Sequence, residues 1–427
     1  MSNSQARKIN IHGMVLQFAY WFAICTYFSF IIATLVDNDW TAGDATLAIT
    51  VMSAVVMFTQ PAFGYVSDKL SEKKLCVILL VVGGLLFFLF PFAIGAGRLF
   101  VVATMVGISV TVVQVNGLMD AWIVGLRQEN EAVNYGLIRG TGAGAFAISA
   151  QISGIITVNF NHDVRFWIGG AFFLLSAITA ITFRATRATG AVSEANVSRA
   201  TGDTCRRRPI PSKPEAVSRS QTKTPRDKQL GVFHVFKKIF SCKKYLLLLA
   251  VSFFLFLSNA PIITLINLLV PEFGGSTAQI GTAIAVMAGT EVPFMFMTAF
   301  LIRKFSYKRL FVLCGLFYFI RLSLMVFVTD VTGLILMQLM QGVTFAVLLP
   351  VAMSYLSKIA PEDVRASAVT TFAAISMSFT GILANLVTSR LLAAGFAAQS
   401  TLIFFAASAF IGFALALYGL ARGLWAE

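Results

Sequence analysis

The stretch GYVSDKLSEKK, residues 64–74, lies between two long apolar runs and carries basic side chains where the apolar character stops. A second stretch of the same kind, AFLIRKFSYKR, occupies residues 299–309, which is 235 positions further along the chain. Each stretch separates the second from the third apolar run of its own half of the sequence. A basic loop repeated at matching positions predicts a membrane protein made of two related halves, with its binding site between them.

Twelve apolar runs are long enough to cross a bilayer as helices, since a hydrocarbon core about 30 Å thick needs about 20 apolar residues. The runs are residues 14–36, 44–66, 75–95, 99–126, 134–158, 164–183, 245–270, 278–302, 308–328, 332–356, 365–388 and 401–421. The first run is too long for a cleavable signal peptide and lacks a small-residue cleavage pattern. The predicted fold class is therefore an all-α membrane protein with twelve transmembrane helices in two six-helix halves.

The composition agrees with a lipid bilayer as the solvent of this chain. Of the 427 residues 57% are hydrophobic and 12% are charged, whereas soluble domains carry about 25% charged residues. The predicted domains are an N-terminal half, 1–183, a basic linker, 184–244, and a C-terminal half, 245–427. The linker holds 15 Lys or Arg and 4 Asp or Glu, which is most of the net charge of +14. We expect it to be largely disordered and cytoplasmic, and we expect no nucleic-acid partner.

Loop charges predict the orientation, because loops rich in Lys and Arg stay in the cytoplasm. The basic loops alternate with acidic ones such as VDNDWTAGD, residues 36–44, and place both termini in the cytoplasm. The arginines that oppose this trend are Arg98, Arg165 and Arg390. We expect a monomeric protein of the cell membrane, which is the inner membrane if the source is a bacterium. The five cysteines lack metal-binding spacing, and no catalytic motif is present, so we expect no metal, no cofactor and no enzyme activity.

Four charged residues lie inside the apolar runs, where each costs at least about 2.5 kcal/mol. Asp120 and Arg139 lie about 10 and 8 Å from the cytoplasmic ends of adjacent spans, at 1.5 Å per residue. Glu291 and Arg321 both lie about 18 Å deep. Each half therefore has one acid and one arginine at matching depths. Glu291 is the best-placed group to bind and release a proton, with Arg321 and Asp120 as the other members of the predicted coupling group.

Static ion pairs that neutralise each other are the alternative interpretation of these charges. We favour function because apolar pairs would pack without the desolvation cost, and because an arginine fork can hydrogen-bond solute hydroxyls. Polar side chains on other spans, among them Asn116, Asn259 and Gln341, are compatible with a lined cavity or with ordinary interhelical hydrogen bonds. A small-residue run in the fifth span, GTGAGAFAISAQISG, residues 140–154, resembles a close-packed helix seam.

These residues together resemble the major facilitator superfamily over nearly the whole chain except the linker. GYVSDKLSEKK is similar to the family's loop between spans two and three, which implies a conformational gate at Gly64, Asp68 and Lys69. The chain is most similar to the branch of lactose permease-like, phenylpropionate and nucleoside proton symporters, with some likeness to sugar efflux transporters. The resemblance places Tyr20, Tyr27, Asp120, Arg139 and Phe146 at solute-binding positions. It also places Glu291 and Arg321 at the family's acid and arginine of spans eight and nine.

The proton relay of the lactose permease differs here, because Gln341, Thr344 and Phe379 stand where that branch has titratable residues. Coupling would then depend on Glu291 and Asp120. The predicted function is proton-coupled alternating-access transport of a small polar solute, which we expect to be a sugar or glycoside. A sugar or drug efflux pump is the alternative, and a non-transporting sensor on the same fold is a third possibility. One sequence does not give the direction of transport.

Overall fold

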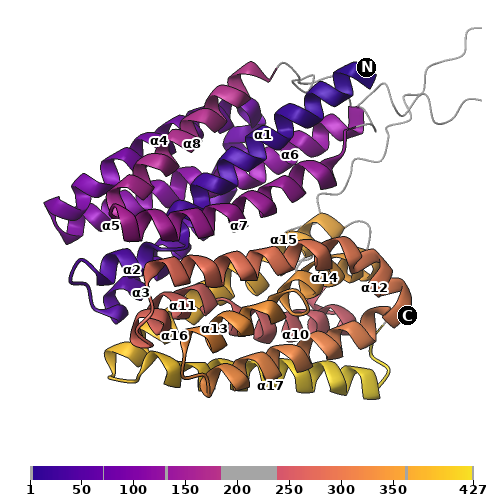
Figure 1. The fold of residues 1–427 in the computed structure, drawn as a ribbon. Coiled ribbons are helices and arrows are strands. Elements are labelled where there is room, and N and C mark those ends of the chain that lie inside the picture. The colour runs from indigo at the N-terminus through magenta and orange to yellow at the C-terminus, as the bar shows by residue number, and fades with distance from the viewer. Residues whose placement is uncertain (1–2, 71, 130–132, 184–237, 361–363, 426–427) are drawn as a thin grey trace, which may run out of the picture.

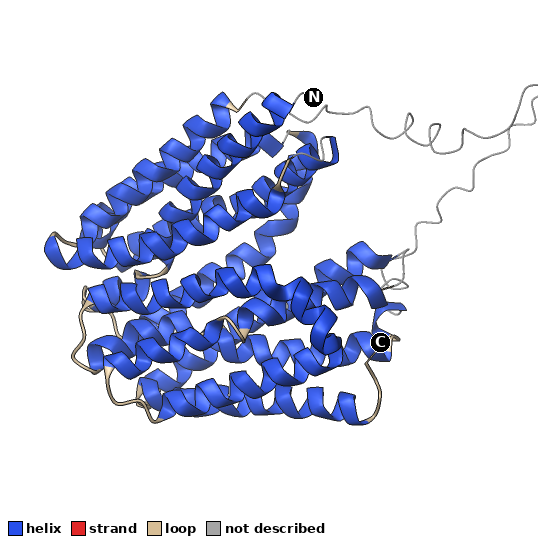
Figure 2. Ribbon diagram, turned by 45° about the vertical axis from the view of Figure 1, so that its right-hand side comes forward, coloured by secondary structure: helices blue, strands red, loops and turns tan. Residues whose placement is uncertain are grey.

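The computed structural model describes residues 3–70, 72–129, 133–183, 238–360 and 364–425. Within these ranges the regular structure is entirely helical (Figure 2), and twelve segments are long and apolar enough to cross a membrane. The predicted fold class is confirmed. Most of the predicted linker lies outside the described residues.

The helices form two bundles, drawn in indigo to magenta and in red to yellow in Figure 1. The first bundle contains α1 (Asn3–Phe28), α2 (Ile31–Val36), α3 (Ala42–Lys69), α4 (Glu72–Ala96), α5 (Arg98–Ile108), the π-helical turn η1 (Ser109–Val113), α6 (Gln114–Glu129), α7 (Tyr135–Asn159) and α8 (His162–Thr182). The second contains α10 (Lys243–Asn259), α11 (Ile262–Glu272), α12 (Thr277–Val326), α13 (Val331–Met337), the 3₁₀ turn η2 (Gln338–Gln341), α14 (Phe345–Ile359), α15 (Arg365–Ala373), the π-helical turn η4 (Ala374–Phe379), α16 (Thr380–Ala393) and α17 (Ala398–Ala421). We call these bundles the N half and the C half.

Several helices begin at a short polar residue whose side chain accepts a hydrogen bond from the first turn. Thr41 accepts from the Asp44 amide at 3.1 Å, and Asn134 accepts from the Leu137 amide at 3.0 Å. Such caps satisfy amide groups that have no partner within the helix. They fix where the spans start after the polar breaks of the sequence.

The two halves share a break in the first span of each. Span one breaks after Ser29, between α1 and α2, and span seven breaks after Ala260, between α10 and α11. The two breaks are 231 positions apart, and each is followed one residue later by an Ile-Ile pair. Spans four and ten are distorted as well, at η1 and η2. The long helix α12 contains spans eight and nine, which are separated by a kink at Ser306 with φ of +61°.

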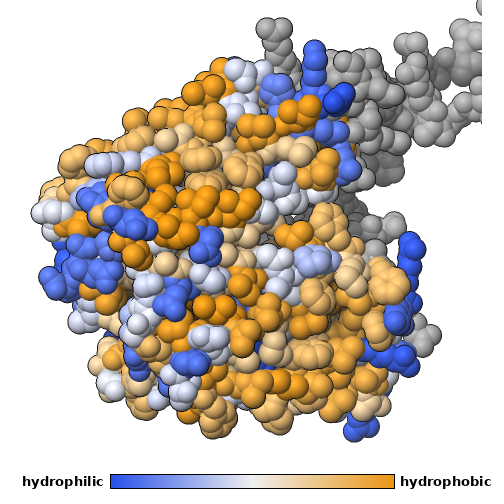
Figure 3. All heavy atoms as spheres, in the orientation of Figure 1, coloured by the Kyte–Doolittle hydropathy of each residue, from blue (hydrophilic) through white to orange (hydrophobic). Residues whose placement is uncertain are grey.

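Each half has its own hydrophobic core. In the N half the ring of Tyr27 packs against Phe87, Phe90 and Phe166, with ring centroids 5.3 to 6.0 Å apart. In the C half Phe311 stacks on Trp425 at 4.7 Å. Large apolar side chains also cover much of the outer surface, as Figure 3 shows. Contiguous exposed apolar surface on a bundle of this kind is where lipid chains pack.

We call the end of the molecule that carries both chain termini the terminal face and the opposite end the far face. The halves meet closely toward the far face, where the Ser389 hydroxyl of α16 donates to the Gly43 carbonyl of α3 at 2.8 Å. Nearby, Gly154 of α7 packs against the backbone of Thr277 and Ala278 at the start of α12. Toward the terminal face the ribbons diverge, and the space-filling view is hollowed between the bundles (Figures 1 and 3). The structure is therefore closed at the far face.

Candidate functional site

In the N half, four side chains from three helices form a closed ring of contacts. The Arg139 Nε atom lies 3.9 Å from Asp120 Oδ2, as expected for arginine and carboxylate at matching depths in adjacent spans. Asp120 Oδ1 accepts from Gln17 Nε2 at 3.4 Å, and Gln17 Oε1 accepts from the Trp21 indole at 2.8 Å. The Arg139 guanidinium lies 4.5 Å from the centre of the Trp21 indole, and this contact completes the circle of four side chains. We call Gln17, Trp21, Asp120 and Arg139 the N-half cluster.

The N-half cluster presents both polar and aromatic surface. The side chains of Arg139 and Asp120 are 34% and 27% exposed, so both can reach a solute. The Phe146 ring meets Trp21 edge-on at 6.1 Å and packs against the cores of both halves. A Cβ atom at Gly142 would lie 3.0 Å from the Trp21 indole nitrogen and closer still to the ring carbon beside it. Gly142 therefore leaves the space that the indole needs.

In the C half, Arg321 is completely buried and binds glutamine side chains. Its two terminal nitrogens donate to Gln341 Oε1 and, at 2.5 Å, to Gln338 Oε1. Thr344 Oγ1 lies 3.5 Å from the Nη1 atom of Arg321. Among the described residues no carboxylate oxygen lies within ion-pair distance of Arg321. The matching depths of Arg321 and Glu291 suggest a direct ion pair. Instead, Arg321 contacts three uncharged polar side chains in or just after η2.

Gln341 joins the arginine to the acid. Its Nε2 atom donates to Glu291 Oε1 at 2.9 Å, while its Oε1 atom accepts from Arg321. Glu291 and Arg321 are therefore linked through one carboxamide rather than by contact. We call Glu291, Arg321, Gln338 and Gln341 the C-half cluster.

The two clusters face each other across the boundary between the halves. Helix α7, which carries Arg139, runs beside the first part of α12, which carries Glu291. A Cβ atom at Gly140, the neighbour of Arg139, would lie 3.3 Å from the ring of Phe296 on the same part of α12 as Glu291. The site thus combines a partly exposed arginine and carboxylate from one half with a carboxyl group from the other.

Several other predicted site residues lie elsewhere. Tyr20 and Tyr27, predicted to contact solute, are completely buried in the N half. The Tyr20 hydroxyl donates to the Val112 carbonyl at 2.9 Å, and the Tyr27 ring belongs to the aromatic core described above. Neither ring can touch a solute in this conformation, because helix packing turns that side of α1 toward α4 and α8.

Asn116 and Asn259 have carboxamide oxygens that are enclosed and that accept no hydrogen bond within the described part of the chain. Asn116 lies on α6, one turn before Asp120, and Asn259 is the last residue of α10, beside the break in span seven. Gly64, Asp68 and Lys69 form the terminal-face end of α3. Their side chains lie outside the described part of the structure, so the gate remains a prediction.

Sequence reasoning missed two residues of the N-half cluster, Trp21 and Gln17. A signal was available, because residues four apart on a helix lie on one face and an indole N–H seeks an acceptor. The sequence analysis also treated Arg165 as one of the loop charges that oppose the predicted orientation. The structure buries Arg165 completely among α2, α7 and α8, so this arginine is a polar core residue and does not report on loop orientation.

Comparison with known proteins agrees with this architecture. Residues 14–404 match the MFS_1 like family. The maltose permease of Geobacillus stearothermophilus is 27% identical over 325 residues, which cover 75% of this chain and 72% of that protein. The lactose permease of Klebsiella oxytoca is 26% identical over 159 residues, covering 36% of this chain and 38% of that protein.

Solved structures show the same fold at low sequence identity. The crystal structure of the nucleoside transporter NupG superposes with a TM-score of 0.73 and 16% identity, over 95% of this chain and 98% of that one. At this identity the likeness concerns the arrangement of the helices alone. The proteins that this chain resembles are membrane transporters.

Proposed function

The chain belongs to the MFS_1 like family of multi-pass membrane transporters, and from this premise we propose that it moves a sugar or glycoside by alternating access coupled to protons. The observation that carries the proposal is the facing pair of clusters, one from each half. Solute would bind between them, contact both halves and favour their movement together.

The chemistry of the N-half cluster supports a neutral, hydroxylated solute. Arg139 and Asp120 offer a donor fork and an acceptor at one place, which suits adjacent hydroxyl groups. Trp21 and Phe146 add aromatic surface on which the apolar face of a sugar ring can pack. A charged solute fits less well, because the exposed charges of this cluster already balance. The names of the maltose and lactose permeases among the relatives agree with a saccharide.

Asn116, Asn259 and Gln341 are the further solute contacts that we propose. The carboxamide oxygens of Asn116 and Asn259 need a donor, which a solute hydroxyl can supply when the halves move. Gln341 bonds to both Glu291 and Arg321. Tyr20 and Tyr27 would support the site from behind by packing α1.

Proton coupling is assigned to Glu291, with Arg321 and Asp120 as the charges that respond to it. Glu291 is a partly buried carboxyl group whose polar partner is an uncharged amide. Loss and gain of its proton would change the charge beside Arg139 and thereby the attraction between the halves. Gln341 would transmit the change to Arg321.

The basic loops support an orientation in the membrane. We propose that the terminal face, with both termini and the linker, lies in the cytoplasm, that the far face is external and that the protein works as a monomer in the cell membrane. The conformation described here would then be closed to the outside. The loop at Gly64, Asp68 and Lys69 would close the cytoplasmic side in the other state.

Counterflow in proteoliposomes tests the proposal. The purified protein is reconstituted with a high internal concentration of one unlabelled solute, and entry of the same labelled solute is followed for a panel of sugars, glycosides, nucleosides and aromatic acids. We expect at least one sugar or glycoside to be exchanged and an imposed proton gradient to drive its accumulation. Exchange restricted to nucleosides or aromatic acids would contradict the saccharide assignment, and accumulation that ignores the proton gradient would contradict the coupling. The direction in cells depends on the gradients, so the same assay also detects a sugar efflux pump.

A further inference from the structure

A hydrogen bond of the helix backbone is missing in span one, at the break between α1 and α2. In a continuous helix the Ala33 amide would donate to the Ser29 carbonyl, four residues earlier. Here the backbone turns at Phe30, with φ of −130° and ψ of 0°. The Phe30 amide donates to Tyr27, and the regular pattern resumes with the Thr34 amide, which donates to the Phe30 carbonyl at 2.9 Å. Ser29 and Ala33 are thus left to find other partners.

A side chain from the other half supplies both partners. Asn267 of α11 donates its Nδ2 hydrogen to the Ser29 carbonyl at 2.8 Å, and its Oδ1 atom accepts from the Ala33 amide at 3.3 Å. The same Nδ2 group also donates to the Ile263 carbonyl at 2.8 Å, which fixes the side chain on its own helix. One carboxamide of the C half therefore takes the place of one helical hydrogen bond of the N half.

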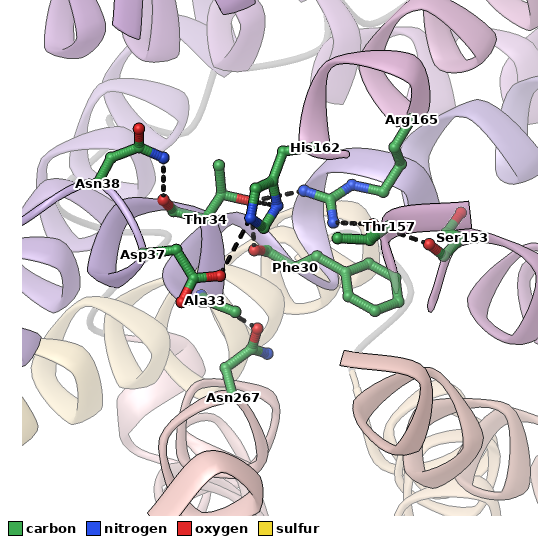
Figure 4. Close-up of polar contacts among 10 residues, drawn as sticks. All are labelled: Phe30, Ala33, Thr34, Asp37, Asn38, Ser153, Thr157, His162, Arg165 and Asn267. Carbon is green, nitrogen blue, oxygen red and sulfur yellow. Dashed lines mark hydrogen bonds and ion pairs between the residues drawn. The ribbon is translucent and has the colours of Figure 1, made fainter. Parts of the chain in front are cut away.

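Arg165 of the N half contacts the segment at the break to which Asn267 bonds. Arg165 donates to Thr34 Oγ1 at 2.5 Å and to Thr157 Oγ1 at 2.9 Å. Its guanidinium also lies 4.9 Å from the centre of the Phe30 ring and 4.9 Å from that of Phe166. Figure 4 shows Arg165 and Asn267 approaching the segment 30–34 from different sides. Contacts within the N half thus hold the segment that follows the break, and the amide of Asn267 bonds to the two backbone groups that the break leaves without helical partners.

These bonds can exist only while the halves touch at the far face. Ser29 and Asn267 are 0% and 2% exposed, so bulk water does not compete for their polar groups in this conformation. Separation of the halves at this end removes both bonds at once and leaves a backbone carbonyl and amide without their partner. We propose that Asn267 is the latch of the far face: its carboxamide closes the break in span one and thereby stabilises the conformation in which this face is shut.

The proposal rests on the alternating access proposed above but not on the identity of the solute or of the coupling ion. Its test is a conformational measurement without solute. Cysteines that replace exposed Phe160 in the N half and exposed Glu272 in the C half carry spin labels, in a protein whose five native cysteines are replaced by alanine. Pulsed electron–electron double resonance then measures the distance between the two spin labels at the far face.

We expect Asn267→Ala to raise the ratio of long to short distances by about tenfold, as the loss of two ordinary buried hydrogen bonds from one of two states would do. Asn267→Asp keeps the acceptor but lacks the donor to Ser29, so it should shift the ratio in the same direction. It also serves as the second variant if the alanine variant does not fold. Asn385→Ala is the matched control, because this buried asparagine bonds to Thr264 and Gly381 within the C half.

A distance distribution of Asn267→Ala and Asn267→Asp that matches that of the parent protein overturns the latch. An equal shift in Asn385→Ala also overturns it, because the effect would then be a general loosening of the C half. A shift that is specific to Asn267 supports the latch even if no saccharide is transported, in which case the proposed solute alone is wrong. Saccharide transport without a shift in the Asn267 variants would support the proposed function and overturn the latch. The two proposals can therefore fail separately.

Discussion

Glu291 and Arg321 differ in how closely each approaches the space between the halves. Arg321 is enclosed by Gln338, Gln341 and Thr344, whereas Glu291 is only partly buried and lies on α12, the helix that packs against α7 of the N half. Under the proposed coupling, a proton on Glu291 would change an interaction between the halves, whereas Arg321 would act only within its own half. This asymmetry makes Glu291 the residue to test first.

Glu291→Gln keeps the shape of the side chain and fixes it in a neutral state. We expect the variant to lose accumulation of solute above its external concentration, because it cannot release a proton during the cycle. Exchange of labelled for unlabelled solute should persist. The measurement is uptake into proteoliposomes with and without a proton gradient. Glu272→Gln, which alters an exposed acid at the end of α11, is the control. Accumulation by Glu291→Gln at the level of the parent protein would assign coupling to another group.

Arg139→Lys tests the N-half cluster. A lysine keeps the positive charge but can neither make a two-pronged contact with adjacent hydroxyls nor lie flat on Trp21, so solute affinity should fall about tenfold or more. The half-saturation concentration for counterflow measures the change. Asp120→Asn should weaken binding as well, because the neutral side chain no longer orients the guanidinium. Unchanged affinity in both folded variants would mean that the pair serves structure only.

At the scale of the helices, small residues decide how closely the halves approach. Gly281 of α12 lies against the Ala150 carbonyl of α7, and Gly154 lies against the Thr277 carbonyl. The run at residues 140–154 thus packs as the seam that its composition indicates, and the seam belongs to the boundary between the halves. A helix pair that slides or parts at such a seam changes access to the site without changing either core.

Gly281→Ala should weaken closure of the far face. Its new methyl group would press on the Ala150 carbonyl, and overpacking of this kind costs about 1–3 kcal/mol. The spin-label distances across the far face should lengthen, while the helix content by circular dichroism stays the same. Gly289→Ala on the same helix is the control, because a Cβ atom there meets nothing within 4 Å. Identical distance distributions for the two variants would contradict this reading of the seam.

At the scale of the whole molecule, the two halves have separate cores and meet mainly through α3, α7, α12 and α16. Few polar contacts would have to break for the halves to rock against each other. The first span of each half is interrupted at a corresponding position, between α1 and α2 and between α10 and α11. The architecture thus suits two rigid bodies that move about a central site.

The orientation of this assembly is open to a direct test. Residues 184–244 carry many trypsin sites, and we expect them to be cytoplasmic because basic loops stay on that side. Trypsin added to right-side-out vesicles should therefore leave residues 184–244 uncut, whereas the same treatment of inverted vesicles should cut the chain within them. Cleavage within residues 184–244 in right-side-out vesicles would reverse the proposed topology.

The sequence alone determined the features that depend on position along the chain. Apolar run lengths give the twelve spans, matched basic loops predict the two halves, and counting residues from the loops predicts the depths of Asp120, Arg139, Glu291 and Arg321. Depth follows from the sequence because a helix rises by a constant 1.5 Å per residue. The contact of Arg139 with Asp120 could be predicted for the same reason.

Only the tertiary structure decided in which direction each side chain points. Tyr20 lies in the core while its neighbour Trp21 lies in the site, and Gln341 separates Glu291 from an arginine at the same depth. Asn267 completes a helix of the other half, more than 230 residues away in the sequence. The rotation of a helix about its axis is set by packing against distant helices, and in a membrane protein apolar residues face both lipid and core. Local pattern therefore fixes how deep a residue lies, and only the assembled bundle fixes what it touches.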